Sequence, residues 1–439
     1  MSVSENRLIT TPHSEAEKMG KEKHDEELPE HTRVEATAGP PDGGLLAWSV
    51  VAGAWCTSFC SFGWLNSVGI FQEYYQRDFL KQYSASTIAW IPSLQVFFML
   101  ASGPFIGYIY DRHGPRYIIL VGTFMHVFGL MMASIATKYY QLLLAQGICS
   151  AIGAAAIFQP ALSSVSGWFD RKRGAAFGVL STGSSTGGII FPIMVTHLID
   201  EVGYGWAMRI AAFMILFLLI IANLTVKCRV PPQPQKLTVQ DLHRPLHEPG
   251  FLLVVAAFAC LTFGIFIPIN YIVVSATSQG MSIELSKYLV PILNAASFFG
   301  RFGTGLVADK LGRYNIYVVV CAVSGILVLA LWLPGSRNAT SLVFAILFGF
   351  SSGAYVSLTP ALVAQISPPR EFGYRNGLMF FFAAFPGLIT NPIAGAILAR
   401  ENGSYDGMKV FAGVFCLAGT VLVAVARFMK TGPKLFVGF

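Results

Sequence analysis

The polar segments of this sequence divide it into twelve apolar stretches, each long enough to cross a lipid bilayer as a helix. The hydrocarbon core of a bilayer is about 30 Å thick, and a helix needs roughly 20 apolar residues to span it. The stretches lie near residues 46–70, 88–110, 117–137, 141–166, 174–199, 206–226, 251–276, 288–308, 314–334, 340–366, 374–399 and 408–429. We therefore expect an all-α membrane protein with twelve transmembrane helices.

The composition supports this fold class and excludes several functions. Of the 439 residues, 54% are hydrophobic and 12% are charged, whereas soluble proteins carry about 25% charged residues. Fifteen of the charged side chains lie in residues 1–44, and the remainder is too sparse to cover a water-facing surface. This excludes a soluble enzyme, a nucleic-acid binder and a disordered scaffold. The seven cysteines follow no spacing typical of a metal site, and we expect no metal or cofactor.

The longest polar interruption lies between the sixth and seventh stretches and divides the chain into two halves. We expect a disordered cytoplasmic tail at 1–44, a six-helix bundle at 45–226, a cytoplasmic linker at 227–250, a six-helix bundle at 251–430 and a short cytoplasmic tail at 431–439. Lys and Arg are twice as frequent in the loops on the linker side as in those on the other side. This bias predicts cytoplasmic termini. The sequons at Asn338 and Asn402 then fall on outer loops, where they predict glycosylation.

Two independent pairs of motifs indicate that the halves are copies of one unit. Residues 107–114 (Gly-Tyr-Ile-Tyr-Asp-Arg-His-Gly) match residues 305–312 (Gly-Leu-Val-Ala-Asp-Lys-Leu-Gly). Residues 153–162 (Gly-Ala-Ala-Ala-Ile-Phe-Gln-Pro-Ala-Leu) match residues 353–362 (Gly-Ala-Tyr-Val-Ser-Leu-Thr-Pro-Ala-Leu) at nearly the same offset. In transporters with two parallel copies of six helices, the binding site lies near the bilayer midplane between the copies.

With these loops the chain resembles the major facilitator superfamily, whose signature is Gly-x-x-x-Asp-Arg/Lys-x-Gly. The resemblance implies two pseudo-symmetric six-helix bundles that transport by alternating access. It also implies that charged residues at the signature hold one end of the protein closed, namely Asp111, Arg112, Arg116, Asp309, Lys310 and Arg313. Charge-assisted bonds at helix ends can break when the bundles move. The alternative interpretation is that these charges only anchor the helix ends at the membrane surface.

A narrower resemblance is to fungal-type members of the monocarboxylate transporter (monocarboxylate porter) family. The resemblance lies in residues 41–48 (Pro-Asp-Gly-Gly-Leu-Leu-Ala-Trp) and residues 297–305 (Ser-Phe-Phe-Gly-Arg-Phe-Gly-Thr-Gly). The resemblance implies that Arg301 binds the substrate carboxylate, which a planar guanidinium can hold with two parallel hydrogen bonds. An arginine in mid-span costs roughly 2.5–3.5 kcal/mol and needs a partner. Alternatively, Arg301 snorkels toward the cytoplasmic side, or binds carbonyls and Asp309.

Neutral polar residues extend the predicted binding site. The predicted substrate-binding residues are Arg301, Ser297, Asn294, Asn66, Asn270 and Tyr271. Three of them share one helix face, because Asn294, Ser297 and Arg301 are spaced i, i+3 and i+7. Each of the neutral residues can instead form a hydrogen bond that links two helices.

Proton coupling does not follow from the resemblance. Animal members of the family have an acidic residue one turn before the arginine and a lysine in the first span, where this chain has Ser297 and Asn66. The remaining proton-binding candidates are His126 and Glu73. A lone histidine inside a membrane is more often a packing residue, although its ordinary pKa suits proton transfer.

These features predict a secondary active or facilitative transporter, a symporter or exporter, for a small organic acid or carboxylate-bearing metabolite. The alternative is an exporter of a secondary metabolite or drug-like compound with no strict carboxylate requirement; a transporter-derived receptor or a membrane enzyme is less favoured. The expected partners are an organic anion or metabolite, the lipid bilayer and, as a second candidate, protons. Nucleic acid is not expected, and the sequence identifies no accessory subunit. The plasma membrane is the favoured location, with the vacuole or another endomembrane as the alternative.

Overall fold

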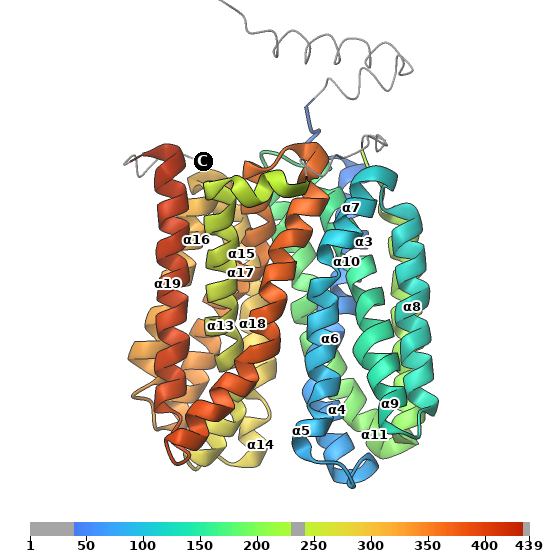
Figure 1. The fold of residues 1–439 in the computed structure, drawn as a ribbon, viewed down its shortest axis with the longest axis vertical. Coiled ribbons are helices and arrows are strands. Elements are labelled where there is room, and N and C mark those ends of the chain that lie inside the picture. Colours follow the sequence, from blue (N-terminus) through green and yellow to red (C-terminus); the bar gives the residue numbers. More distant parts are fainter. Residues whose placement is uncertain (1–38, 230–241, 433–439) are drawn as a thin grey trace, which may run out of the picture. The chain divides into compact units, whose positions relative to one another are not determined.

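The computed structural model describes residues 39–229 and 242–432, and from Asp42 onward these residues form long, parallel-running helices (Figure 1). The predictions for the N-terminal tail, for the middle of the linker and for the C-terminal tail concern residues 1–38, 230–241 and 433–439, which lie outside the described residues. All regular secondary structure in the described part of the chain is helical.

The N-terminal bundle comprises the helices from α3 to α11. Its elements are α3 (Leu45–Ser58), the π-helix η1 (Phe59–Gly63), α4 (Val68–Tyr74), the π-helix η2 (Tyr75–Phe79), α5 (Ala85–Ile88), α6 (Trp90–Ala101), α7 (Gly103–His113), α8 (Arg116–Ile135), α9 (Tyr139–Leu142), the π-helix η3 (Leu143–Ser150), α10 (Ala151–Trp168) and α11 (Arg173–Thr225).

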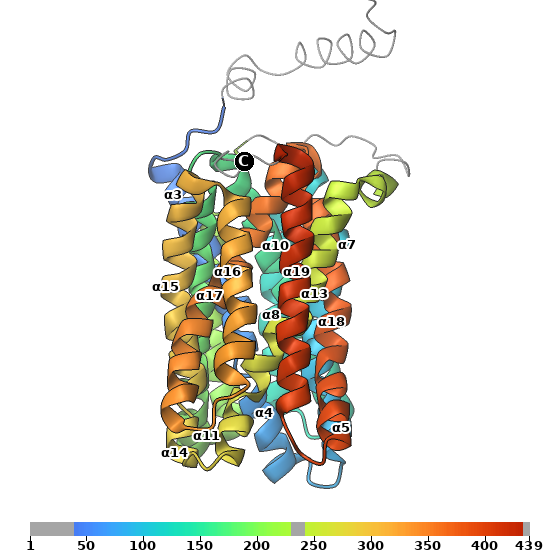
Figure 2. The ribbon, with the colours of Figure 1, turned by 90° about the vertical axis from the view of Figure 1, so that its left-hand side faces the viewer.

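The C-terminal bundle comprises the helices from α13 to α19, preceded by a short turn of the linker. The elements are the 3₁₀-helix η4 (Arg244–His247), α13 (Pro249–Ser278), α14 (Ile283–Ser286), α15 (Leu289–Leu311), α16 (Arg313–Leu327), the π-helix η5 (Val328–Trp332), α17 (Asn338–Ile366), the 3₁₀-helix η6 (Pro369–Glu371), α18 (Phe372–Arg400) and α19 (Asp406–Thr431). Figure 2 faces this bundle, in which α15 and α16 both pack on α17.

The predicted count of twelve spans agrees with these helices. In the part of the chain that the structure describes, ten helices are long and apolar enough to cross a membrane. One of them, α11, contains Gly203 with φ 81° and ψ 162°, so it consists of two spans joined at a break. The remaining span is α15, whose 23 residues include charged Arg301, Asp309 and Lys310. These charges lower its hydropathy, while its length still suffices for a bilayer.

The first span is longer and less regular than the sequence analysis predicts. It continues to Phe79 instead of ending near residue 70, and a turn at Asn66 and Ser67 interrupts it two residues after the π-helix η1. Breaks of this kind free backbone groups, and in membrane proteins they occur where the backbone is buried in protein or lines a cavity. Asn66 therefore lies at an irregular point of its span.

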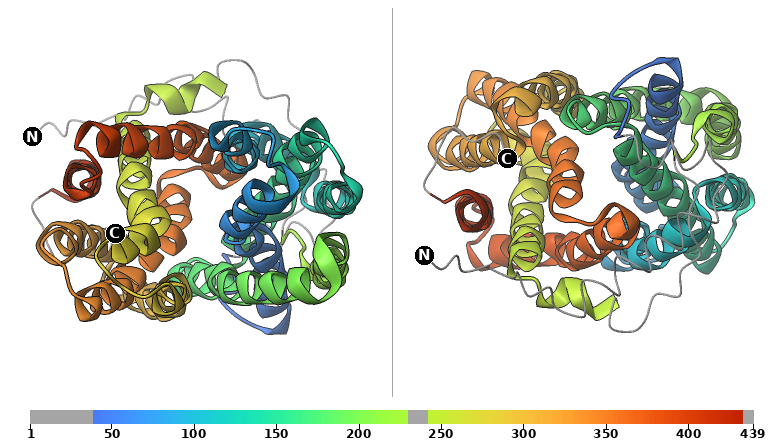
Figure 3. Two further views of the ribbon diagram at one scale, coloured as in Figure 1. Left: turned by 90° about the horizontal axis from the view of Figure 1, so that it is seen from below. Right: turned by 90° about the horizontal axis from the view of Figure 1, so that it is seen from above.

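Two helix interfaces hold the bundles together. One interface is formed by α11 with α15, and the other by α18 with α6 and α7. Figure 3 shows the two bundles from both ends, with the blue-to-green helices on one side and the yellow-to-red helices on the other. Glycines allow close approach at both interfaces: a Cβ on Gly178 would lie 2.7 Å from the carbonyl of Arg301, and one on Gly103 would overlap the carbonyl of Gly377.

The hydrogen bonds between the bundles are concentrated toward one end. We call this the motif end, since it carries Asp111 and Asp309 of the two repeated loops. From there the recorded bonds extend along α11 as far as Gly188, about half of its first span. In Figure 1, α18 and α6 converge toward the same end. The two bundles are therefore closed against each other at the motif end.

The sequons lie at the opposite end of the helices from the motif end. Asn338 is the first residue of α17, and Asn402 lies in the turn between α18 and α19 with φ 54°. Both residues are exposed. Their position is compatible with modification, and glycosylation itself stays a prediction.

We predict that Gly107→Ala destabilises the closed form by about 1–3 kcal/mol, the usual cost of overpacking. A Cβ at Gly107 would overlap the backbone of Gly373, which cannot move aside as a flexible side chain can. The matched control is Gly303→Ala on α15, where nothing lies within 4 Å; there we expect no loss and up to about 1 kcal/mol of gain. Thermal unfolding of the purified variants measures both, and equal melting temperatures would contradict the close packing.

Candidate functional site

Arg301 is buried at the interface between the bundles. It is 8% exposed and reaches from α15 to the first span of α11. Its Nε donates to Ser297 Oγ at 3.1 Å, and its Nη1 donates to the Ser181 carbonyl at 2.6 Å and to Ser184 Oγ. Among the described residues, none of its hydrogen bonds goes to Asp309 or to any other carboxylate. The guanidinium is therefore shielded from lipid, and it links the two bundles through neutral oxygens.

Two predicted amides, one from each bundle, meet at Gly188 of α11. Asn66 donates from Nδ2 to the carbonyl of Phe62 at 2.8 Å. Asn294 donates from Nδ2 to the carbonyl of Val290 at 3.2 Å and to that of Gly188 at 3.5 Å. A Cβ on Gly188 would lie 2.9 Å from Asn66 Nδ2 and 3.0 Å from Asn294 Oδ1. The glycine thus allows both amides to approach one point of the interface.

Serines line the α11–α15 interface between Asn294 and Arg301. Ser297 accepts the Arg301 bond and lies 3.4 Å from Ser185 Oγ of α11. Asn294, Ser297 and Arg301 are all buried. The structure therefore brings four of the six predicted substrate-binding residues, Asn66 included, to the α11–α15 interface. The sequence analysis did not single out the α11 serines, because serines in an apolar stretch usually bind their own helix backbone.

Asn270 and Tyr271 of α13 belong to a separate polar group. Asn270 Nδ2 donates to Asn391 Oδ1 at 2.9 Å, and the Tyr271 hydroxyl donates to the Asn391 carbonyl at 3.3 Å. These bonds link α13 to α18 within the C-terminal bundle, and neither residue is bonded to Arg301. The sequence analysis did not single out Asn391, although its position before Pro392 in an apolar stretch is a signal for freed polar groups.

Asp111 crosses from the N-terminal bundle to the first turn of α18. Its carboxylate accepts hydrogen bonds from the backbone N–H groups of Gly373 at 2.9 Å and Tyr374 at 2.8 Å. Free N–H groups and the positive end of the helix dipole make a helix start a favourable site for an anion. Asp111 therefore caps a helix of the opposite bundle.

Asp309 makes the reciprocal contact from the C-terminal bundle to α11. It accepts from the backbone N–H groups of Gly174 and Ala175, both at 2.8 Å. Arg313 supports it with an Nε–Oδ1 bond of 3.1 Å and also donates to the carbonyl of Asp170 in the N-terminal bundle. The two repeated aspartates thus close the motif end with the same geometry, and Arg313 adds a cation to only one of them.

The other cations of the predicted gate lie elsewhere. Arg112 donates from Nη1 to the hydroxyl of Tyr108 at 2.7 Å and stacks over that ring. Arg116 and Lys310 are exposed, and no ion pair of either is found among the described residues. The carboxylates of the predicted gate are therefore bound mainly by backbone N–H groups instead of by the neighbouring cations of their motifs. A gating role for all six residues stays a prediction.

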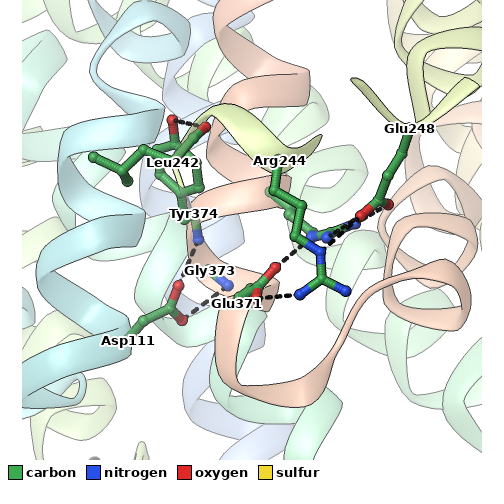
Figure 4. Close-up of polar contacts among 8 residues, drawn as sticks. Asp111, Leu242, Arg244, Glu248, Glu371, Gly373 and Tyr374 are labelled. Atoms are coloured by element: carbon green, nitrogen blue, oxygen red, sulfur yellow. Dashed lines mark hydrogen bonds and ion pairs between the residues drawn. The ribbon is translucent and has the colours of Figure 1, made fainter. Parts of the chain in front are cut away.

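A cluster of four charged residues lies beside the Asp111 contact (Figure 4). Arg375 of α18 is fully buried and donates to both carboxylate oxygens of Glu248, at 2.6 and 2.7 Å, and to Glu371 at 2.9 Å. Arg244 of η4 pairs with Glu248 at 3.5 Å and with Glu371 at 3.9 Å. The cluster therefore attaches the end of the linker to the start of α18. Its sequence signal was the i, i+4 spacing of Glu371 and Arg375, which the sequence analysis did not use.

The two proton candidates differ in their surroundings. His126 has partners at both ring nitrogens: Nδ1 lies 2.9 Å from Ser150 Oγ, and Nε2 lies 3.0 Å from the Cys60 carbonyl. Such full satisfaction fits a packing residue that links α8 to η3 and η1. Glu73 is exposed. Neither residue contacts Arg301.

The family model that describes the Major Facilitator Superfamily matches residues 53–348. The chain therefore belongs to this superfamily, and its geometry, two bundles closed at one end around a buried polar interface, is that of a multi-pass membrane transporter. The Escherichia coli fucose:proton symporter FucP has a similar fold, with a TM-score of 0.67, 13% identity, and coverage of 85% of this chain and 98% of that one.

Two curated relatives are much closer in sequence. The MFS transporter asaE of Aspergillus flavus is 63% identical over 91% of this chain and 91% of its own length. The fujikurins efflux protein of Gibberella fujikuroi is 52% identical over 91% of this chain and 86% of its own length. The chain is thus a transporter and not an enzyme.

We predict that Asp111→Ala and Asp309→Ala each weaken the closed motif end. Each removes two hydrogen bonds to a charged acceptor, worth about 1.5–3 kcal/mol apiece. A cysteine placed at buried Ser185 should then react faster with a maleimide added from the motif end. Asp78→Ala is the control, because among the described residues Asp78 forms an ion pair only with exposed Arg77 at the opposite end, and such pairs contribute little. Unchanged labelling in both gating variants would contradict the capping role.

The Glu248–Arg375 pair predicts a pH-dependent stability. Hydrogen bonds from Arg375 hold the pKa of Glu248 below its usual value. The pair therefore stabilises the protein fully above the ordinary glutamate pKa, about 4.3, and this stabilisation is lost as the pH falls through the lowered value. The difference in Tm between the native protein and Glu248→Gln should be constant near pH 7 and shrink below about pH 4.3. A difference that grows on acidification would contradict the pairing; Glu284→Gln, exposed at the opposite end, is the control.

Proposed function

We propose that this transporter exports a secondary metabolite that carries an acidic group. The observation that carries the proposal is the similarity to the fujikurins efflux protein, which extends over nearly the whole chain. The bias of Lys and Arg supports cytoplasmic termini. The motif end then faces the cytoplasm, and the plasma membrane is the location that suits export.

Alternating access follows from the contacts at the motif end. In the closed form, Asp111 and Asp309 each cap a helix of the opposite bundle. For a cytoplasmic metabolite to enter between the bundles, both caps have to be released, and they re-form once the substrate has left on the other side. Because helix caps are short-range contacts, a small rotation of the bundles breaks them completely.

Arg301 is the residue that we expect to bind the acidic group. Its present partners are two neutral oxygens of α11 and the hydroxyl of Ser297. A carboxylate is a stronger acceptor for a guanidinium than a hydroxyl or a carbonyl, so a substrate can take over the bonds to Ser181 and Ser184. The exchange would remove a link between α15 and α11, and substrate binding would thereby loosen the closed interface.

Amide side chains near Arg301 would orient the substrate. Asn294 and Asn66 meet at Gly188, one or two turns along the same interface from Arg301, and offer amide groups to the substrate. Asn270 and Tyr271 belong to a separate polar group on α13 and would bind a substrate from that helix. This arrangement is compatible with the monocarboxylate porter branch of the superfamily, to which we assign the chain as part of the proposal.

Proton coupling is not part of this proposal. Asn66 and Ser297 replace the charged residues of the animal monocarboxylate transporters, and His126 already has partners at both nitrogens. A carboxylate bound to Arg301 would cross as an anion. A membrane potential that is negative inside would then favour its export without a proton site in the protein.

The test uses proteoliposomes loaded with 2-naphthoate or with the uncharged 2-naphthamide. We predict that the native protein transports the acid, that Arg301→Gln lowers its initial rate by about 100-fold because an uncompensated carboxylate costs several kcal/mol, and that Arg301→Lys retains an intermediate rate because lysine cannot form the bidentate pair. Transport of the amide should not depend on residue 301.

Ser184→Ala is the matched control. It removes one present partner of Arg301 without changing the charge, so it should preserve selectivity for the acid. Equal rates for native protein and Arg301→Gln with 2-naphthoate would remove Arg301 from the binding site. Failure of every variant and the native protein to move either compound would contradict export of aromatic acids altogether.

A further inference from the structure

A small cavity lies at the second interface between the bundles, away from Arg301. It is lined by Phe62, Ala155, Phe158 and Gln159 of the N-terminal bundle and by Phe380 of α18, among others. In this closed form the pocket has no room for a water molecule, so a ligand can enter it only when the bundles separate. Because Phe380 belongs to the opposite bundle, the cavity widens when the bundles separate.

Gln159 has a buried amide oxygen without a partner at this pocket, in the part of the chain that the structure describes. It is 3% exposed, and its Oε1 has no hydrogen-bond partner among the described residues. Leaving a buried acceptor unpaired costs about 1–3 kcal/mol, and most buried polar groups are therefore paired. An unpaired amide oxygen that lines a pocket is what a site for a hydrogen-bonding ligand requires.

Aromatic rings surround this amide and continue across the interface. Phe158 packs edge-to-face against Phe62, with centroids 4.9 Å apart, and against Phe380 at 6.2 Å. Phe380 packs against Phe258 at 5.9 Å, and Phe258 stacks on Tyr355 at 5.0 Å. We call these five residues the aromatic row. It extends from the first span through α10 and α18 to α13 and α17.

The internal repeat shows that the cavity is specific to one copy. Ala155 stands where the second copy has Tyr355, and Gln159 stands where it has Thr359. In the second copy the ring of Tyr355 is buried, and Thr359 is paired with the Tyr317 hydroxyl at 2.9 Å. Alanine in place of tyrosine removes a large ring. The first copy therefore has the smaller side chain and the unpaired amide oxygen, and it gains more room when the bundles separate.

The two interfaces between the bundles, α11 with α15 and α18 with α6 and α7, also have different linings. The offset that relates Gly107 to Gly305 also relates Gly103 to Arg301. Around Arg301 the interface is lined by serines and Asn294, whereas around Gly103 it is lined by phenylalanines and Gln159, whose Nε2 would lie 3.0 Å from a Cβ on Gly103. Pseudo-symmetric positions thus provide a cationic, polar side and an aromatic side.

From these observations we infer that the aromatic cavity binds the planar, conjugated body of the substrate, and that Gln159 donates a hydrogen bond to, or accepts one from, a polar substituent on that ring system. The inference rests on the proposed export function and narrows its substrate class to aromatic metabolites with a ring-bound hydroxyl or carbonyl group. Ring faces attract one another in offset and edge-to-face geometries, so the aromatic row can accept a flat ligand without a further charged group.

The test is binding of three matched probes to the purified transporter in lipid nanodiscs: 6-hydroxy-2-naphthoate, 2-naphthoate without the hydroxyl, and the saturated decahydro-2-naphthoate. We expect the hydroxylated aromatic acid to bind most tightly and the saturated acid to bind about threefold to tenfold more weakly than 2-naphthoate. We expect the native protein to bind 6-hydroxy-2-naphthoate about threefold to tenfold more tightly than 2-naphthoate. Gln159→Leu should abolish this preference and leave 2-naphthoate binding unchanged.

Two further variants separate a binding role from a structural one. Ala155→Tyr copies the second repeat, fills the cavity and should weaken all aromatic probes; Ala155→Val is the milder alternative where tyrosine prevents folding. Thr359→Val changes the repeat counterpart of Gln159, lies outside the cavity and should alter no preference. Loss of the hydroxyl preference in Thr359→Val, or its retention in Gln159→Leu, would overturn the inference.

The outcomes also separate this inference from the proposed function. If 2-naphthoate is transported in an Arg301-dependent way while aromatic and saturated acids bind equally, the aromatic cavity is not the binding site, and export of acids still stands. If the aromatic preference is present and depends on Gln159 but no flux is seen in proteoliposomes, the binding inference stands and the proposed export fails.

Discussion

The bundles are held together by an interaction between a carboxylate and the start of a helix, used twice. Asp111 and Asp309 each accept two backbone hydrogen bonds from a helix of the opposite bundle. The N–H groups at a helix start have no partner within their own helix, so the contact satisfies both sides while it exists and leaves both unsatisfied when it is broken. Because water can then bind the freed groups, breaking the contact costs little enough for the closure to be reversible.

Close backbone packing is the condition for these caps. Gly103 and Gly107 face Gly377 and Gly373, and Gly174 and Gly178 face the equivalent positions of α15. With side chains at these positions the helix starts could not reach the aspartates. The signature loops and the glycines therefore act as one unit, and the duplicated sequence gives the two interfaces the same geometry with different linings.

Much of this fold could be predicted from the sequence, because lipid imposes a length and a hydropathy on every span. The twelve spans, the break between the halves and the buried position of Arg301 follow from that constraint. The hydrogen-bond partners of the charged side chains could not be predicted from the sequence. Backbone N–H groups carry no signal in the sequence, so the capping by Asp111 was not foreseen, and neither was the meeting of Gln159 with the aromatic row, which depends on helices far apart in the chain.

The central claim is that the two ends open in alternation as the aspartate caps are released. The most direct measurement is a pair of spin-label distances in one preparation, between positions 116 and 430 at the motif end and between positions 81 and 284 at the opposite end. Replacing Asp111 and Asp309 together by alanine should lengthen the first distance and shorten the second. If both distances change in the same direction, or neither changes, the caps do not control the opening.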